Sequence, residues 1–202
     1  MKALLVAFLP LALAAGSVGA QAGAIGVFGD PRGASCELYD RTPGLTSFYI
    51  VHVLTPGAMG SQYSAPKPAC LMATWLSDTN MFPVTIGNSQ VGMSVAYGSC
   101  RVGPIHVQTM NYFGTGTTPA CCRYGACPHV NSLAGLIEVI DCDENLVYGW
   151  AYEGIVNSTP FCGCYACASP ACVEALHRTS SNCYAVSVED ATWGRVKSAY
   201  SE

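Results

Sequence analysis

Short runs of β-branched and aromatic residues recur along the chain, and each run is bounded by Gly, Pro, Asn or Ser. No helical period separates these runs, which argues against a parallel α/β sheet. Such spacing predicts an all-β fold, an antiparallel β-sandwich or jelly-roll-like barrel. The predicted strands are Leu45–Leu54, Met72–Leu76, Phe82–Ile86, Met93–Tyr97, Ile105–Phe113, Leu136–Asp141 and Val147–Val156, with short candidates at Ala24–Phe28 and Cys36–Tyr39.

Three regions break the strand pattern. Gly114–Asn131 is rich in turn residues, and Pro160–Cys183 is rich in Cys without a strand signal. Ser187–Tyr200 predicts a short terminal helix. We therefore expect a single β-sandwich domain over 21–159, with 160–202 as a disulfide-rich C-terminal extension and helix packed on the same domain.

The first residues have the pattern of an export signal. Lys2 precedes an apolar stretch from Leu4 to Ala15, which is too short to span a bilayer. Small residues before Gln21 then fit a cleavage site. The sequence predicts a signal peptide over 1–20 and a secreted protein, extracellular or periplasmic, without a membrane span after cleavage.

Composition narrows the class of function. The chain is 50% hydrophobic and only 11% charged, against about 25% charged in average proteins. This balance is opposite to that of disordered chains. Without Lys2 there are 8 basic and 13 acidic residues and no basic stripe, so we expect no nucleic-acid partner.

All twelve cysteines follow the predicted cleavage site, and an even number in an exported chain is typical of disulfide bonds. Cys36, Cys70, Cys100 and Cys142 each stand at a strand end. We therefore expect Cys36 to pair with Cys70, and Cys100 to pair with Cys142. At least eight of the twelve should be bonded. The predicted disulfide cysteines are Cys36, Cys70, Cys100, Cys121, Cys122, Cys127, Cys142, Cys162, Cys164, Cys167, Cys172 and Cys183.

Two motifs have the residue types of metal ligands. The run from Cys162 to Cys183 with His177 offers sulfur and nitrogen ligands for zinc, but an oxidising compartment favours disulfides. Asp141, Asp143 and Asn145 have the alternate spacing that opens an EF-hand loop, yet the Gly and Glu required later in the loop are missing. We therefore expect an acidic hairpin turn here, and no metal or cofactor.

Catalytic motifs are absent from the sequence, which has neither a Gly-x-Ser-x-Gly elbow nor a His-Glu-x-x-His helix. His52 and His106 lie mid-strand and would form a metal pair only if both faced the same side. Glu138 and Glu153 are the strand-borne carboxylates that could serve glycoside hydrolysis, if they faced each other. We expect no enzyme and no activity on ester, peptide or glycoside substrates.

The last strand carries the candidate ligand-binding residues. Period two places Tyr148, Trp150 and Tyr152 on one face and small or aliphatic residues on the other. If the aliphatic face is inward, the three rings form an exposed strip able to stack on sugar rings. If the aromatic face is inward, the rings are core. Both alternatives stay open at this point.

Four segments resemble exported, Cys-rich bacterial β-proteins, and the order of strands is similar by fold analogy to immunoglobulin-like, cohesin-like and carbohydrate-binding-module-like sandwiches. The resemblance implies no activity, so it carries over no catalytic residue, and Pro160–Cys183 departs from it. The segments are FPVTIGNSQVG (Phe82–Gly92), PIHVQTMNYFGTGTTPACC (Pro104–Cys122), IEVIDC (Ile137–Cys142) and TWGRVKSAY (Thr192–Tyr200).

Together these features predict a secreted, disulfide-stabilised binding or structural protein without catalytic activity. A polysaccharide-binding module and a secreted hydrolase with a site assembled from distant residues are the alternatives. The partner would be a polysaccharide or another cell-surface protein.

Overall fold

The computed structural model describes residues 22–132 and 134–162, and this part of the chain is all β. The predicted leader over 1–20 and the terminal helix at Ser187–Tyr200 lie outside the described residues. The strands are β1 (Ala24–Phe28), β2 (Glu37–Leu38), β3 (Gly44–Val53), β4 (Ala58–Tyr63), β5 (Ala73–Asn80), β6 (Val84–Asn88), β7 (Gly92–Arg101), β8 (Ile105–Gly114), β9 (Cys122–Gly125), β10 (Ile137–Asp141) and β11 (Leu146–Val156).

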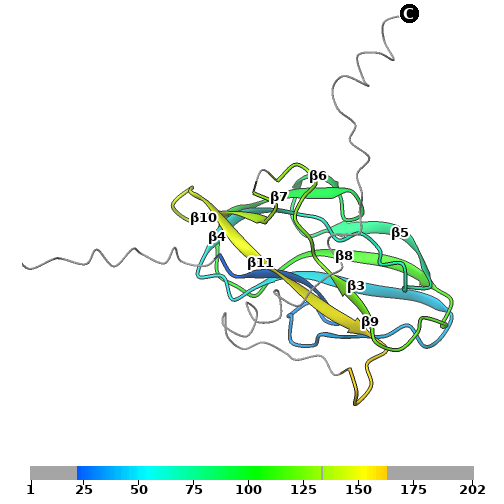
Figure 1. Cartoon of the computed structure of the whole chain (residues 1–202). Coiled ribbons are helices and arrows are strands. Elements are labelled where there is room, and N and C mark those ends of the chain that lie inside the picture. Colours follow the sequence, from blue (N-terminus) through cyan, green and yellow to red (C-terminus); the bar gives the residue numbers. More distant parts are fainter. Residues whose placement is uncertain (1–21, 133, 163–202) are drawn as a thin grey trace, which may run out of the picture.

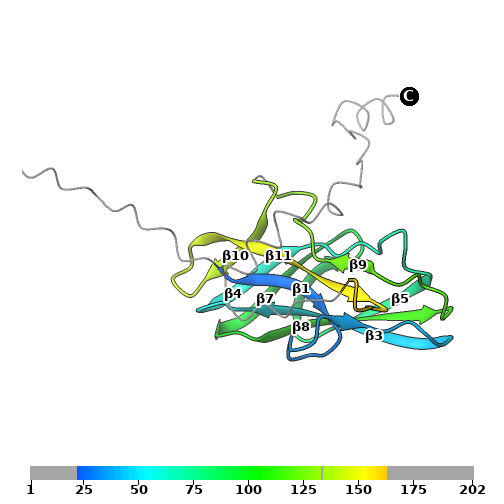
Figure 2. The ribbon, with the colours of Figure 1, turned by 60° about the horizontal axis from the view of Figure 1, so that its bottom comes forward.

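The strands form a β-sandwich of two sheets that share β11 (Figures 1 and 2). The first sheet has the order β5-β8-β3-β1-β11, and the second has the order β6-β7-β4-β10-β11. The start of β11 pairs antiparallel with β10, its middle pairs parallel with β1, and its end pairs with β9 and β2. β11 therefore closes one side of the sandwich, while β5 and β6 are the two edges of the other side.

Every predicted strand is present, although several boundaries differ by a few residues. The sequence pattern missed β4 and β9. β4 has the sequence AMGSQY, which lacks β-branched residues and has weak strand propensity. It forms because β10 and β7 pair with it on both sides, so tertiary pairing outweighs local preference. β9 lies inside the turn-rich region and pairs with the end of β11.

The core between the sheets is unusually rich in tyrosine. Tyr63, Tyr97, Tyr112 and Tyr124 are fully or almost fully buried. Each hydroxyl has a partner: Tyr63 donates to Gln108 at 2.9 Å, and the hydroxyls of Tyr112 and Tyr124 lie 2.6 Å apart. Burial raises the pKa of Tyr112 to about 12. Because of these bonds, the large tyrosine side chains fill the core without leaving a buried hydroxyl that lacks a hydrogen-bond partner.

Three disulfides connect pairs of described residues, and one of them differs from a predicted pair. Cys100 is bonded to Cys142, as predicted, but Cys70 is bonded to Cys122 and not to Cys36. The pairing of Cys36 with Cys70 is wrong because Cys70 packs on the core between the sheets, whereas Cys36 belongs to an apolar cluster apart from that core.

The remaining described cysteines are also oxidised. Cys121 is bonded to Cys162, and Cys36 and Cys127 are disulfide-bonded as well. Cys162 is therefore not a thiolate ligand of the suggested zinc site. The other cysteines of that motif, Cys164, Cys167, Cys172 and Cys183, lie outside the described residues.

A buried histidine links the N-terminal end of the described chain to the core. His52 Nε2 lies 2.6 Å from the carbonyl oxygen of Ala22, and Nδ1 lies 3.2 Å from the hydroxyl of Tyr97. Desolvation lowers the pKa of His52 to about 4, although the hydrogen bond to Ala22 opposes this shift. The folded protein therefore keeps this imidazole neutral.

We expect acid to destabilise the fold through His52. Its pKa is lower in the folded chain than the ordinary value of 6.5, so the unfolded chain binds more protons between those values and stability falls as pH drops from about 6.5 to about 4. The expected loss is about 3 kcal/mol. Denaturant unfolding at several pH values measures it.

His52→Gln should flatten this pH dependence, whereas His106→Asn, at a partly exposed position, should retain most of it. Equal pH slopes for the wild type and His52→Gln would contradict the assignment.

Candidate binding surface

The aromatic side chains of β11 do not form a continuous exposed strip. Tyr148 is 43% exposed, Trp150 is half-buried, and Tyr152 is only 3% exposed. The ring of Tyr152 stacks on Phe28 with centroids 5.0 Å apart and planes 5° apart. The three-ring platform that a polysaccharide would need is therefore not present on this face.

Both alternatives for β11 assumed that only one of its faces is buried. Ala151 packs into the core between the sheets, while Tyr152 and Trp150 belong to a second apolar cluster with Phe28 and Val51. The middle of β11 is thus buried on both faces. This is why its aromatic and its aliphatic positions both look like core in the sequence.

The two strand-borne carboxylates do not converge. Glu138 pairs in register with Tyr148, and Glu153 lies five residues further along β11, about 17 Å away along the strand. The odd separation also places Tyr148 and Glu153 on opposite faces. Hydrolysis of a glycosidic bond needs two carboxylates within about 10 Å, and Glu153 instead forms an ion pair of 3.5 Å with Arg123.

The histidine pair is not assembled either. His52 is opposite Ile105 and His106 is opposite Val51, so the two imidazoles point to opposite faces of the first sheet. His106 lies against the ring of Tyr49. Over the described residues, no group of three or more His, Cys, Asp and Glu side chains could hold a metal ion.

The acidic motif after β10 forms the expected hairpin turn. Asp141 Oδ1 accepts hydrogen bonds from the backbone N–H groups of Asp143 and Asn145, at 2.9 and 2.8 Å. These bonds, led by that from Asn145, lower the pKa of Asp141. The carboxylate therefore holds the turn together.

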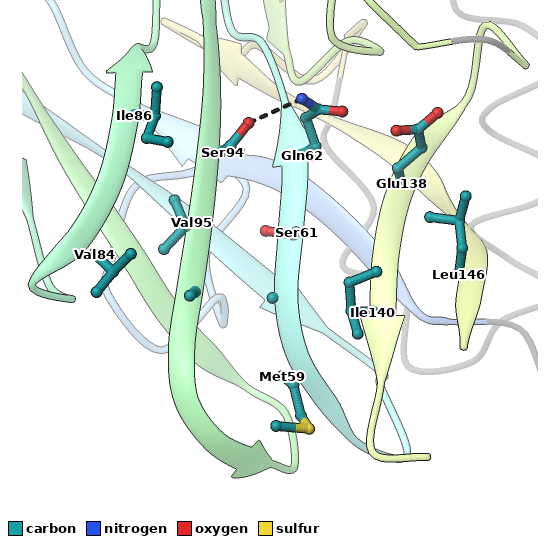
Figure 3. Close-up of a pocket in the computed structure, with 12 residues that line it drawn as sticks. Met59, Ser61, Gln62, Val84, Ile86, Ser94, Val95, Glu138, Ile140 and Leu146 are labelled. Atoms are coloured by element: carbon teal, nitrogen blue, oxygen red, sulfur yellow. Dashed lines mark hydrogen bonds between the residues drawn. The ribbon is translucent and has the colours of Figure 1, made fainter. Parts of the chain in front are cut away.

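The outer face of the second sheet carries a shallow trough of about 440 Å³ (Figure 3). One row of side chains crosses the whole sheet in register. From the β6 edge to β11, this row is Val84, Ala96, Gly60, Ile140 and Leu146. Every member is apolar or lacks a side chain.

A neighbouring row on the same face supplies polar groups. It consists of Ile86, Ser94, Gln62, Glu138 and Tyr148. Gln62 Nε2 donates a hydrogen bond of 2.9 Å to Ser94 Oγ across the floor. On β7 and β4, Ala96 and Gly60 are small, and Ser94 and Gln62 are hydrogen-bonded to each other. These residues form the floor of the trough.

The walls of the trough are large, exposed apolar side chains. Val84 and Ile86 on β6 are 58% and 74% exposed, and Leu146 opposite them is 53% exposed. Figure 3 shows β6 on one side, β10 and β11 on the other, and Met59 at one end. Three strand spacings separate β6 from β10, a width of about 14 Å, and an α-helix with its side chains is about 10–12 Å wide.

Local sequence pattern does not predict this surface. Val84 and Ile86 form an alternating apolar pair, which is typical of a buried strand face. The floor belongs to β4, a strand that the pattern missed. Only the register of five strands that are distant in sequence brings these residues together.

Comparisons with known proteins give limited similarity. No family model and no curated protein sequence matches the chain. Among solved structures, the sixth cohesin of scaffoldin B from Acetivibrio cellulolyticus, in complex with a mutant dockerin, shares 10% identity at a TM-score of 0.41, covering 61% of this chain and 94% of that one. A cohesin module of a family 33 glycoside hydrolase from Clostridium perfringens shares 7% identity at a TM-score of 0.39, covering 62% and 93%.

The fold assignment rests on the strand order and register of this chain itself. The described segments, 22–132 and 134–162, contain no helix able to cross a membrane. Their disulfides are typical of proteins that fold in an oxidising compartment.

Proposed function

We propose that this protein is an exported binding module that engages a protein partner through the trough on the second sheet and performs no catalysis. One observation carries the proposal: the in-register row from Val84 to Leu146 lies on the outer face of a sheet. Soluble monomers rarely expose contiguous apolar surface without a binding role. Export is supported by the predicted signal peptide and by the disulfides.

The geometry of the trough favours a protein over a sugar or a small substrate. Its lining is mostly aliphatic, with Tyr148 as the aromatic residue of its two rows, whereas sugar-binding faces rely on stacked aromatic rings. The width of about 14 Å from β6 to β10 suits a helix, whose apolar face would cover Val84, Ile86 and Ile140.

Filling the trough should abolish partner binding. The wild-type protein is immobilised and exposed to the extracellular fraction of the organism that makes it, and the captured protein is then purified. Ala96 is exposed at the centre of the floor, so Ala96→Trp adds bulk where the partner would lie without disturbing the core. We expect the affinity for the purified partner to fall at least tenfold, or about 1.4 kcal/mol, in a calorimetric titration.

A matched substitution on the other sheet serves as the control. Leu45 is 79% exposed on β3 of the first sheet, so Leu45→Trp adds the same ring away from the trough and should bind like the wild type. Equal affinity of Ala96→Trp and wild type for the captured partner would contradict the proposed function.

A further inference from the structure

We infer that the partner presents a cationic amphipathic segment to the trough, an inference that rests on the proposed function. The trough is apolar along one row and bordered by carboxylates at β10 and at the turn that follows. Glu138 belongs to the second row, and Asp141, Asp143 and Glu144 lie in the turn between the wall residues Ile140 and Leu146.

Glu138 is placed to anchor a basic side chain. It is half-buried at the trough, and Ser132 Oγ donates a hydrogen bond of 2.9 Å to its Oε1. Within the described part of the chain, Oε2 has no hydrogen-bond partner. Figure 3 shows the carboxylate between Gln62 and Leu146, beside the apolar wall. A Lys or Arg of the partner could pair with Oε2 while its neighbours cover the wall.

The turn adds fixed negative charge beside the same wall. The bonds to Asp141 that close the turn keep the pKa of this carboxyl low, so it stays ionised at neutral pH. Asp143 and Glu144 are exposed at the tip. These carboxylates and Leu146 belong to the same tight β-hairpin. At physiological salt, charges this close to the apolar wall still attract a cation bound there.

Positive groups near the trough do not balance these carboxylates. Arg101, opposite Ala58 in the register, donates to the carbonyl oxygen of Tyr97 and lies over the ring of Phe82. It keeps its positive charge, but it is one cation against the four carboxylates of Glu138 and the turn. Burial lowers the pKa of His129, although Glu138 acts in the opposite direction. This histidine is therefore neutral at pH 7, and the local field favours a cation.

Two synthetic peptides test the charge preference. Both are 14-residue amphipathic helices with the same Leu positions, one carrying Lys and the other Glu on the polar face. Binding is measured from amide chemical shifts of the 15N-labelled full chain at low and high salt. We expect the Lys peptide to bind and the Glu peptide not to bind, and added salt to weaken the Lys complex.

Two isosteric substitutions locate the charge that matters. Glu138→Gln should weaken the Lys peptide by about tenfold at low salt. Glu37→Gln removes the same charge from β2, which pairs with the far end of β11, and should have no effect. Ala96→Trp should abolish binding by filling the floor.

The outcomes separate the two proposals. If both peptides bind equally and only Ala96→Trp abolishes binding, the cationic preference is wrong and the proposed function stands. If neither peptide binds, the cationic amphipathic segment is wrong, and the proposed function is judged by the captured partner alone. If Ala96→Trp changes the affinity of neither the Lys peptide nor the captured partner, the trough is not a docking surface and both proposals are wrong.

Discussion

Tyr152→Ala is expected to lower the free energy of unfolding by about 3–5 kcal/mol, the usual range for removing a buried aromatic ring. Tyr152 is 3% exposed and stacks on Phe28, and Val51 of the same cluster is fully buried. Removing the ring would leave a cavity and end the stacking contact. Urea-induced unfolding of the wild type and the variant measures the difference.

Tyr148 provides the matched control on the same strand and face. Because it is exposed, Tyr148→Ala should change stability by no more than about 0.5 kcal/mol. Trp150→Ala should fall between the two variants, since Trp150 is half-buried against the same cluster. Near-neutral unfolding of Tyr152→Ala would show that the second apolar cluster does not stabilise the fold.

Removing the disulfide between Cys100 and Cys142 should cost about 4 kcal/mol in the chain-entropy model. The bond joins residues 42 apart in sequence and connects the end of β7 to the turn after β10. These strands flank β4, the floor strand whose own sequence has weak strand propensity. The bond therefore also holds the floor of the trough between its neighbours.

The double variant Cys100→Ala/Cys142→Ala removes this disulfide without leaving a free thiol at either position. Its unfolding free energy is compared with that of the wild type under non-reducing conditions. The amide signals of β4 should broaden or shift more than those of β3, which lies in the other sheet. A loss below about 1 kcal/mol would contradict the chain-entropy estimate.

Sequence pattern was sufficient for strands whose residues carry their own β preference. The β3 run, with Tyr49, Ile50 and Val51, and the β8 run are examples, and both were predicted. It was insufficient for β4, where Gly60, Ser61 and Gln62 take strand geometry from their neighbours. Local pattern also does not show whether other residues cover the second face of a strand, as they do at Tyr152 on β11.

The candidate surface was not predictable from local pattern. Val84 and Ile86 differ in no local property from the buried apolar pairs of other strands, yet β6 is a sheet edge whose outer face is uncovered by the described chain. From the sequence, Glu138 is a candidate only for a catalytic carboxylate. Its role beside the trough depends on its register opposite Gln62, which no single segment encodes.

The amide chemical-shift footprint of the captured partner on the 15N-labelled protein tests the central claim most directly. If the trough is the docking surface, the largest changes will fall on β7, β4 and β10, around Ala96, Gly60 and Ile140. The amides around Leu45 and Asn111 of the first sheet will stay unchanged. A footprint centred on the first sheet, with β7 and β4 unaffected, would contradict the account.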